Sequence, residues 1–273
     1  MRVILSRKGF DSGYGGCASP ILPDGTMISM PIPDSTGNCR YNDLIAPDGK
    51  RYSEIWKDLL QKDSYEERCH LDPDIRGNIR IQPENWRPAF GQTGAAQSHL
   101  ENNGVKIGDI FLFFGWFRKT EYINGKLLYV KDAPDIHAIY GYLQIGEILK
   151  GFDVKKCPWH PHSEDSHIYS KYNQLTNNTI YVASKSLVID GNDTGLTGSG
   201  ILQFSEKRVL TLPNAETRTQ WKLNDIFETV PITYHTKNSI KNGYFQSAKR
   251  GQEFVFGDDI RVVKWMMNAV TNN

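Results

Sequence analysis

The stretches GDIFLFFGWFR (residues 108–118) and IHAIYGYLQIGEIL (residues 136–149) are the most strongly patterned segments of the chain, and the turn sequence YINGKLLYV (residues 122–130) separates them. Both are rich in the aromatic and branched residues that strands favour. Apolar side chains fill both alternating sets of positions from 110 to 114, so neither face of the first strand is polar. We therefore predict two adjacent strands that are covered on both sides.

This strand pair is similar to one found in PUA-like barrels, including the ASCH and EVE groups, over roughly residues 105–149. The resemblance implies a small β-barrel that binds RNA, a modified base or a nucleotide in a pocket. Trp116 and Phe117 beside Arg118 are candidates for stacking a base and clamping its phosphate. For the phenylalanines that precede them, we prefer an interpretation as core residues.

The rest of the chain predicts further strands and few helices. Polar turns separate apolar runs at 179–189, 209–212 and 252–256. Helical spacing predicts helices over 52–60, 94–101 and 259–269, with Ser53 and Thr93 as candidate caps of the first two. A Pro-Asp-Gly turn at 23–25 predicts a hairpin. We expect an α+β fold of mainly antiparallel strands, a curved sheet or barrel with a few flanking helices, as a single domain over residues 1–273.

Composition indicates an ordinary globular protein. The 273 residues are 39% hydrophobic, and the formal net charge of +1 argues against binding nucleic acid through bulk positive charge. The N-terminus lacks the apolar core of a signal peptide, and no run is long enough to span a bilayer, so we expect a cytoplasmic protein that does not bind membranes. Four separated cysteines form no C-x-x-C pair, which favours reduced thiols over disulfides or a zinc ribbon.

The opening stretch RVILSRKGFDSGYGGCASPILPDG (residues 2–25) places charged residues and glycines directly after a short apolar strand. Its glycines match a dinucleotide-binding pattern, but the prolines that follow exclude the helix on which that pattern depends. Arg7 and Lys8 could instead hold an anion together with backbone amides near Gly15 and Gly16, with Asp11 as a nearby carboxylate. The alternative is a tight turn whose charges are solvated.

A second polar group lies in CHLDPDI (residues 69–75). His70 and Asp72 could act as a general base and its orienting carboxylate if an extended backbone points both the same way. They could equally bind a metal or form a plain polar loop. The segment NWRPAFGQTGAAQSH (residues 85–99) follows and reads as a ligand-binding loop.

A third polar group is CPWHPHSEDSH (residues 157–167), which holds Cys157, His160, His162 and His167. Its C-x2-H-x-H spacing is uncommon among zinc sites. We therefore predict a surface loop that covers the mouth of a pocket, and no metal site.

Seven phrases occur in one order along the chain: MRVILSRKGFDSGYGG, SPILPDG, HLDPD, WRPAFGQTGAAQSHL, GDIFLFFGWF, YGYLQIGE and KRGQEF. Together they resemble the third type of the nucleotide modification associated domain family, from Met1 to about Phe256. The resemblance implies an association with bacterial and phage systems that hypermodify bases in DNA. Its polar signature falls on Arg7, Lys8, Asp11, His70, Asp72, Arg87, Gln92, Gln97, Arg118 and Gln144.

Two hypotheses follow from these residues. The first is an enzyme that modifies nucleotides or DNA bases, in which His70 is the general base and Asp72 or Asp11 orients it. Its substrate-binding candidates are Arg7, Lys8, Gly15, Gly16, Arg87, Gln92, Gln97, Trp116, Arg118 and Gln144. The alternative is a non-catalytic reader of modified bases, which would have less use for a His-Asp pair; a structural subunit that works with other proteins of a modification system is a third. No reaction or cofactor follows from the sequence.

Overall fold

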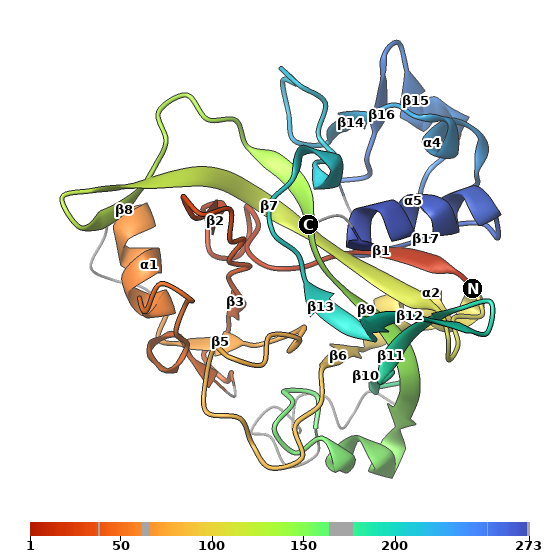
Figure 1. Ribbon diagram of the computed structural model, residues 1–273, viewed down its shortest axis with the longest axis horizontal. Helices are drawn as coiled ribbons and strands as arrows, with labels where there is room; N and C mark the ends of the chain where they lie inside the picture. The colour runs from red at the N-terminus through yellow and green to blue at the C-terminus, as the bar shows by residue number, and fades with distance from the viewer. Residues whose placement is uncertain (38, 62–65, 164–176, 250, 272–273) are drawn as a thin grey trace.

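The computed structural model describes residues 1–37, 39–61, 66–163, 177–249 and 251–271. In this part of the chain the largest sheet has nine strands, with the order β17-β1-β7-β9-β10-β6 and with β2, β8 and β13 attached to its centre (Figure 1). Its strands are β1 (Val3–Arg7), β2 (Ser19–Ile21), β6 (Ala89–Gln92), β7 (Ile110–Ile123), β8 (Lys126–Tyr129), β9 (Ile136–Lys150), β10 (Thr179–Ala183), β13 (Ser199–Ile201) and β17 (Glu253–Val255).

The strand pair predicted from the sequence is confirmed. β7 and β9 are antiparallel neighbours, in a register that runs from Ile110 opposite Gln144 to Phe117 opposite Ile136. Both faces of β7 are covered, because Phe111 packs against Tyr181 on one side and Phe114 packs against Trp221 on the other. These phenylalanines are core residues, as the sequence analysis preferred.

The sheet is mixed and open. β1 and β2 run parallel to β7, whereas the other pairings within the sheet are antiparallel. Its edge strands β17 and β6 do not pair with each other among the described residues, so the expected alternative of a closed barrel is not formed. The mainly antiparallel α+β class is confirmed.

The described residues also form three smaller sheets and four short 3-10 helices. The smaller sheets are β3 (Ile32–Pro33) with β5 (Arg68–His70) and β4 (Cys39–Arg40); β11 (Ser186–Ile189) with β12 (Asn192–Thr197); and β14 (Gln220–Lys222) with β16 (Tyr244–Gln246) and β15 (Ile240–Lys241). The 3-10 helices are η1 (Tyr41–Asp43), η2 (Gly151–Lys156), η3 (Glu206–Arg208) and η4 (Lys237–Ser239).

The helices flank the sheets, and three of the four helices of the described residues lie where the sequence predicts them, whereas the short helix over residues 225–229 was not predicted. They are α1 (Tyr52–Leu60), α2 (Gly94–Asn102), α4 (Asp225–Thr229) and α5 (Ile260–Thr271). The predicted cap of the first helix is wrong, because Ser53 lies inside α1 and the cap position is Arg51, whose backbone N–H donates to Glu54 Oε2 at 2.8 Å. Thr93 is the residue before α2, as predicted, but its side chain makes no capping hydrogen bond.

Three hydrophobic clusters hold the elements together. The largest surrounds the main sheet and joins Val3 near the N-terminus to Val270 on α5. A second surrounds α1 and the β3-β5-β4 sheet, and a third lies beneath η2 and β10. The polar ends of β1, β5 and β6, at Arg7, His70 and Gln92, line one cavity, and this is where the candidate site forms.

Candidate functional site

Six segments that are separated in the sequence line one cavity of about 470 Å³. That volume lies within the range of about 300–1,000 Å³ that is usual for small-molecule sites. We call it the histidine cavity, and its lining residues are Arg7, Lys8, Gly9, Asp11, Tyr14, Ile32, Pro33, Asp34, Ser35, His70, Asp72, Gly91, Gln92, Thr93, His162 and Gln252. Arg7, Lys8, Asp11, His70, Asp72 and Gln92 were therefore brought together as the sequence suggested.

One wall of the histidine cavity carries the two cations at the end of β1. Arg7 Nη2 donates to the carbonyls of Lys249 at 3.1 Å and Gly251 at 2.7 Å, which fixes the guanidinium, and burial lowers its pKa. Lys8 Nζ lies 3.0 Å from Glu253 Oε1 and 4.4 Å from the centre of the Phe90 ring. Because Glu253 is buried, its carboxylate needs a counter-ion, and Lys8 fills that role.

The glycine loop that follows is organised by Asp11. Its Oδ1 accepts hydrogen bonds from the backbone N–H groups of Gly13 at 2.7 Å and Tyr14 at 2.8 Å, so the carboxylate holds its own turn. The Gly16 N–H donates to the carbonyl of Asp11, and a side chain at Gly15 would collide with the Phe10 ring. Neither glycine lines the cavity, and the contacts of both are those of a tight turn.

The opposite wall holds His70 and Asp72. The Asp72 N–H donates to the His70 carbonyl at 3.0 Å, so a tight turn, and not the extended backbone expected, aims both side chains into the cavity. Their nearest ionisable atoms, His70 Nε2 and Asp72 Oδ2, are 3.9 Å apart, which is beyond hydrogen-bond distance. The other oxygen, Oδ1, accepts from the Gly91 N–H at 2.8 Å and lies 3.3 Å from His160 Nε2.

His162 completes the cluster. Its Nδ1 lies 2.8 Å from Asn178 Oδ1, while Asn178 Nδ2 donates to the His162 carbonyl at 2.8 Å. Since the amide nitrogen is committed to that carbonyl, the oxygen faces the ring and Nδ1 must be the donor. The lone pair of His162 is therefore on Nε2.

Burial affects the charge states of His162 and Asp72 differently. Burial lowers the pKa of His162 to about 3, so the ring is neutral at neutral pH. Burial alone would raise the pKa of Asp72, but the hydrogen bond from His160 and the nearby imidazoles outweigh it and hold that pKa well below its ordinary value. One ligand atom from each of His70, Asp72 and His162 lies within 4.8 Å of the others, which is a spacing that suits a metal ion.

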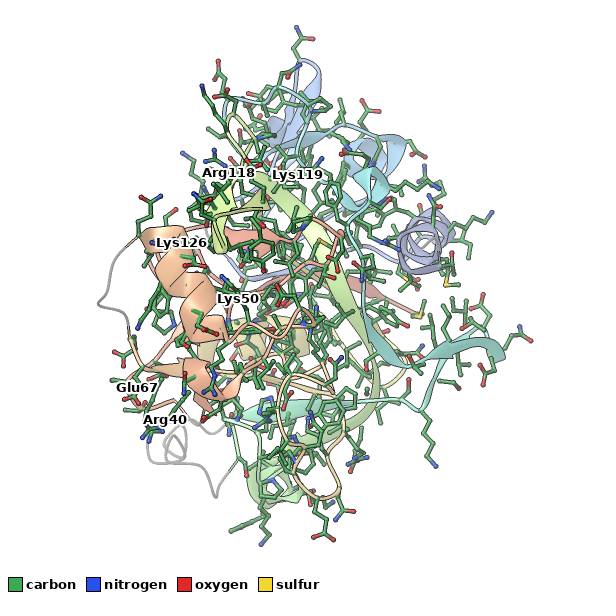
Figure 2. The ribbon with its side chains drawn as sticks, turned by 60° about the vertical axis from the view of Figure 1, so that its left-hand side comes forward. Arg40, Lys50, Glu67, Arg118, Lys119 and Lys126 are labelled. Atoms are coloured by element: carbon green, nitrogen blue, oxygen red, sulfur yellow. The ribbon has the colours of Figure 1, made fainter. Side chains whose placement is uncertain are left out.

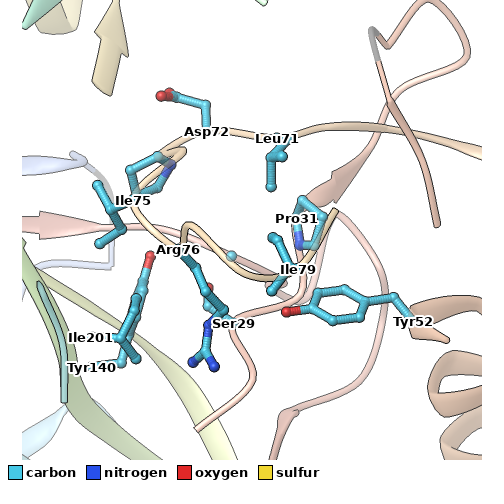
Figure 3. A pocket seen from close by; sticks show the side chains of 12 residues that line it. Ser29, Pro31, Tyr52, Leu71, Asp72, Ile75, Arg76, Ile79, Tyr140 and Ile201 are labelled. Atoms are coloured by element: carbon cyan, nitrogen blue, oxygen red, sulfur yellow. The ribbon is translucent and has the colours of Figure 1, made fainter. Parts of the chain in front are cut away.

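A smaller cavity of about 30 Å³ lies behind Asp72, between Ser29 and Tyr140 (Figure 3). It has room for about one water molecule. The Asp72 carboxylate points away from it in Figure 3, towards the histidine cavity. The substrate-sized space is therefore on the histidine side of this loop.

Three predicted residues lie outside the histidine cavity in structural contacts. Arg87 forms an exposed ion pair with Glu147 at 2.9 Å. Gln97 is buried in α2, where its Oε1 accepts from Tyr181 Oη at 2.9 Å. Gln144 Nε2 donates to the Val188 carbonyl at 2.7 Å and its Oε1 accepts from the Val188 N–H at 2.8 Å, which ties β9 to β11.

The predicted aromatic platform also lies outside the histidine cavity. The guanidinium of Arg218 sits 4.1 Å from the centre of the Trp116 ring. Arg118 lies beside Lys119 on β7 (Figure 2), 5.1 Å from the centre of the Tyr129 ring. These contacts occupy both side chains with neighbours in the fold.

Three buried polar residues around the cavity were not among the predicted site residues: His160, His162 and Glu253. The C-x2-H-x-H spacing was the signal for the two histidines, and they are buried against β6 instead of lying on a surface loop. His167, the last residue of that group, lies outside the described residues. Glu253 lies in the phrase KRGQEF, where no local pattern separated it from an ordinary strand residue.

Comparisons with known proteins agree with the resemblance noted in the sequence. The model of nucleotide modification associated domain 3 matches residues 2–257. No curated protein and no solved structure matches the chain. Within the described residues, every helix is too short or too polar to cross a membrane. Because the family match spans most of its length, this chain belongs to the nucleotide modification associated domain 3 family.

Proposed function

We propose that this protein binds a nucleotide or a base of DNA in the histidine cavity and catalyses a step in its modification. One observation carries the proposal: the cations of β1 and the histidine–aspartate cluster, which come from distant segments, face one substrate-sized space. A family role in nucleotide modification supports the substrate class. Other proteins of a DNA modification system are the partners we propose for it.

The proposed substrate lies across the cavity, with its phosphate at Arg7. A guanidinium held by two backbone carbonyls is pre-organised for an anion, which lowers the entropy lost on binding. The exposed Gln252 offers an amide group to the polar edge of a base, and Tyr14, which is 55% exposed at the rim, offers a ring on which a base could stack. Gln92 supports the wall instead, because its Nε2 donates to Glu253 Oε1 at 2.8 Å and its Oε1 accepts from the Thr93 N–H at 3.0 Å.

The proposed reaction end is the wall with His70 and Asp72. A cluster of buried histidines beside an ionised carboxylate is costly to maintain, and such arrangements concentrate at reactive sites. A reader of modified bases would gain nothing from this cost. Asp11 is assigned to the loop turn and not to the reaction, because its Oδ1 is engaged by two N–H groups.

Binding tests the first half of the proposal. Titration of the purified chain with the four deoxynucleoside 5′-monophosphates and with short DNA should show binding that Arg7→Ala weakens by about tenfold or more and makes less salt-dependent. Arg87→Ala is the matched control, since it removes an exposed arginine away from the cavity. Equal affinities for the wild type and Arg7→Ala would refute the phosphate assignment.

Product analysis tests the second half. DNA incubated with the protein and its associated modification system, then digested to nucleosides and examined by mass spectrometry, should contain a modified base. His70→Asn should keep nucleotide affinity within a few-fold and abolish that product. If wild-type protein binds modified bases and alters none, the chain is a reader.

A further inference from the structure

We propose that His70, Asp72 and His162 bind one divalent first-row transition metal ion in the histidine cavity. One ligand atom from each residue lies within 4.8 Å of the other two. The distance between His70 Nε2 and Asp72 Oδ2 is 3.9 Å. Metal bonds of about 2.0–2.2 Å put neighbouring ligand atoms about 3–4 Å apart. The cluster therefore needs side-chain adjustments of about 1 Å or less, with no change of backbone.

The protonation state of His162 suits a ligand. Asn178 fixes the proton on Nδ1, so the lone pair is on Nε2, as metal coordination requires. Proteins usually orient a metal-binding histidine through a hydrogen bond from its other ring nitrogen to a carbonyl or carboxylate oxygen. This tautomer comes from hydrogen-bond geometry, which is independent of the spacing of the cluster.

Asp72 is oriented in the same manner. Its Oδ1 accepts a hydrogen bond from the Gly91 N–H at 2.8 Å and lies 3.3 Å from His160 Nε2, while Oδ2 lies 3.9 Å from His70 Nε2. A carboxylate with one oxygen bound to the protein and one facing two imidazoles is arranged to bind a cation. His160 is thus a positioning residue.

Close packing supports a built site. A Cβ at Gly91 would lie 2.4 Å from His162 Cδ2 and 2.7 Å from His160 Cε1, so both rings rest on the bare backbone of β6. Both histidines are almost fully buried. Rings held this tightly lose little further freedom when an ion binds.

Charge also favours a cation. The described lining holds two positive side chains, Arg7 and Lys8, and three negative ones, Asp11, Asp34 and Asp72. Glu253, which pairs with Lys8, adds a further negative charge beside the cavity. The described lining is therefore net negative when its histidines are neutral. A divalent ion would offset this charge.

The donor set selects the class of metal. Two imidazoles and one carboxylate suit zinc, iron(II), cobalt or nickel, whereas calcium and magnesium prefer sites made of oxygen. Three protein ligands leave positions open for water or a substrate. The inference concerns metal binding alone, so it stands or falls separately from the proposed nucleotide chemistry.

Metal titration of the full chain is the test. After removal of adventitious metal with a chelator, CoCl2 should produce the visible absorption bands of cobalt bound to nitrogen and oxygen ligands, at one ion per chain, and ZnCl2 should displace it. His162→Ala and His70→Ala should each weaken binding by at least about 100-fold, and Asn178→Ala by about 10–100-fold. His99→Ala, which removes a histidine from α2 outside the cavity, should bind like the wild type.

Several outcomes would overturn the proposal. Wild-type protein that binds neither Co²⁺ nor Zn²⁺ refutes it whether or not the variants fold. So does unchanged affinity in folded His162→Ala and His70→Ala, checked by circular dichroism. Arg7→Ala should keep the cobalt spectrum even if it loses nucleotides, so failure of the metal site and failure of the nucleotide site give different results.

Discussion

Gly91→Ala offers the sharpest test of how the histidine cavity is built. Gly91 has no left-handed φ, so alanine adds no backbone strain, and the whole effect comes from its methyl group. That methyl would lie 2.4 Å from His162 Cδ2, about 1 Å inside the usual carbon–carbon distance. Overpacking of this kind costs about 1–3 kcal/mol, and the reduced freedom of the unfolded chain returns about 0.4–1 kcal/mol. We expect a net loss of about 1–2 kcal/mol.

The same collision should displace His162 from its place opposite Asp72. Urea denaturation should report the loss of stability, and cobalt titration should report at least about a tenfold loss of affinity, since sites tolerate misplacement of only about 0.5 Å. Gly13→Ala is the matched control, because its methyl would meet only Asp11 Oδ1 at an ordinary 3.4 Å. A Gly91→Ala protein with wild-type stability and wild-type cobalt affinity would refute this account.

Three further changes test individual contacts. Gln144→Ala should lower the unfolding free energy by about 1–3 kcal/mol in urea denaturation, because the backbone groups it satisfies become unpaired; no loss would contradict its structural role. Lys8→Met should cost about 3–5 kcal/mol in the same assay by stranding the buried Glu253, and a cost below about 1 kcal/mol would count against the pair. Burial raises the pKa of the Cys17 thiol to about 11 from an ordinary 9.0. Between these two pH values the unfolded thiol ionises while the folded thiol stays protonated, so the free energy of unfolding is unaffected by ionisation of Cys17 below pH 9 and falls as the pH rises to about 11. Cys17→Ser should flatten that part of the stability–pH curve by about 2–3 kcal/mol, and an unchanged slope would exclude the shift.

The central strand pair could be predicted because its evidence is local. Apolar residues at both alternating sets of positions from 110 to 114 require cover on two faces, and the structure supplies it with Tyr181 and Trp221. Whether the sheet closes depends on which distant segments form its edges. β17 and β6 take those places through long-range pairing, and no local pattern encodes it.

The candidate site divides in the same way. Arg7, His70 and Asp72 stand in unusual polar phrases at strand ends, where loops carry functional groups, and they face one cavity. Arg87, Gln97 and Gln144 share that polarity, but their partners satisfy them elsewhere in the fold. A polar residue in a sequence shows a need for a partner and does not show whether that partner is a ligand or the protein itself.

The histidine pair at 160 and 162 shows why a motif search underestimates such a site. Ligand spacing within one loop is informative only when one loop supplies most of the ligands, as in zinc ribbons. Here His162 comes from a different segment than His70 and Asp72, and it packs on the backbone of β6 at Gly91, where a side chain would collide with the imidazole. The residue that makes the arrangement feasible is therefore a glycine with no chemistry of its own, and this is why Gly91→Ala probes the site more directly than removal of any one charged side chain.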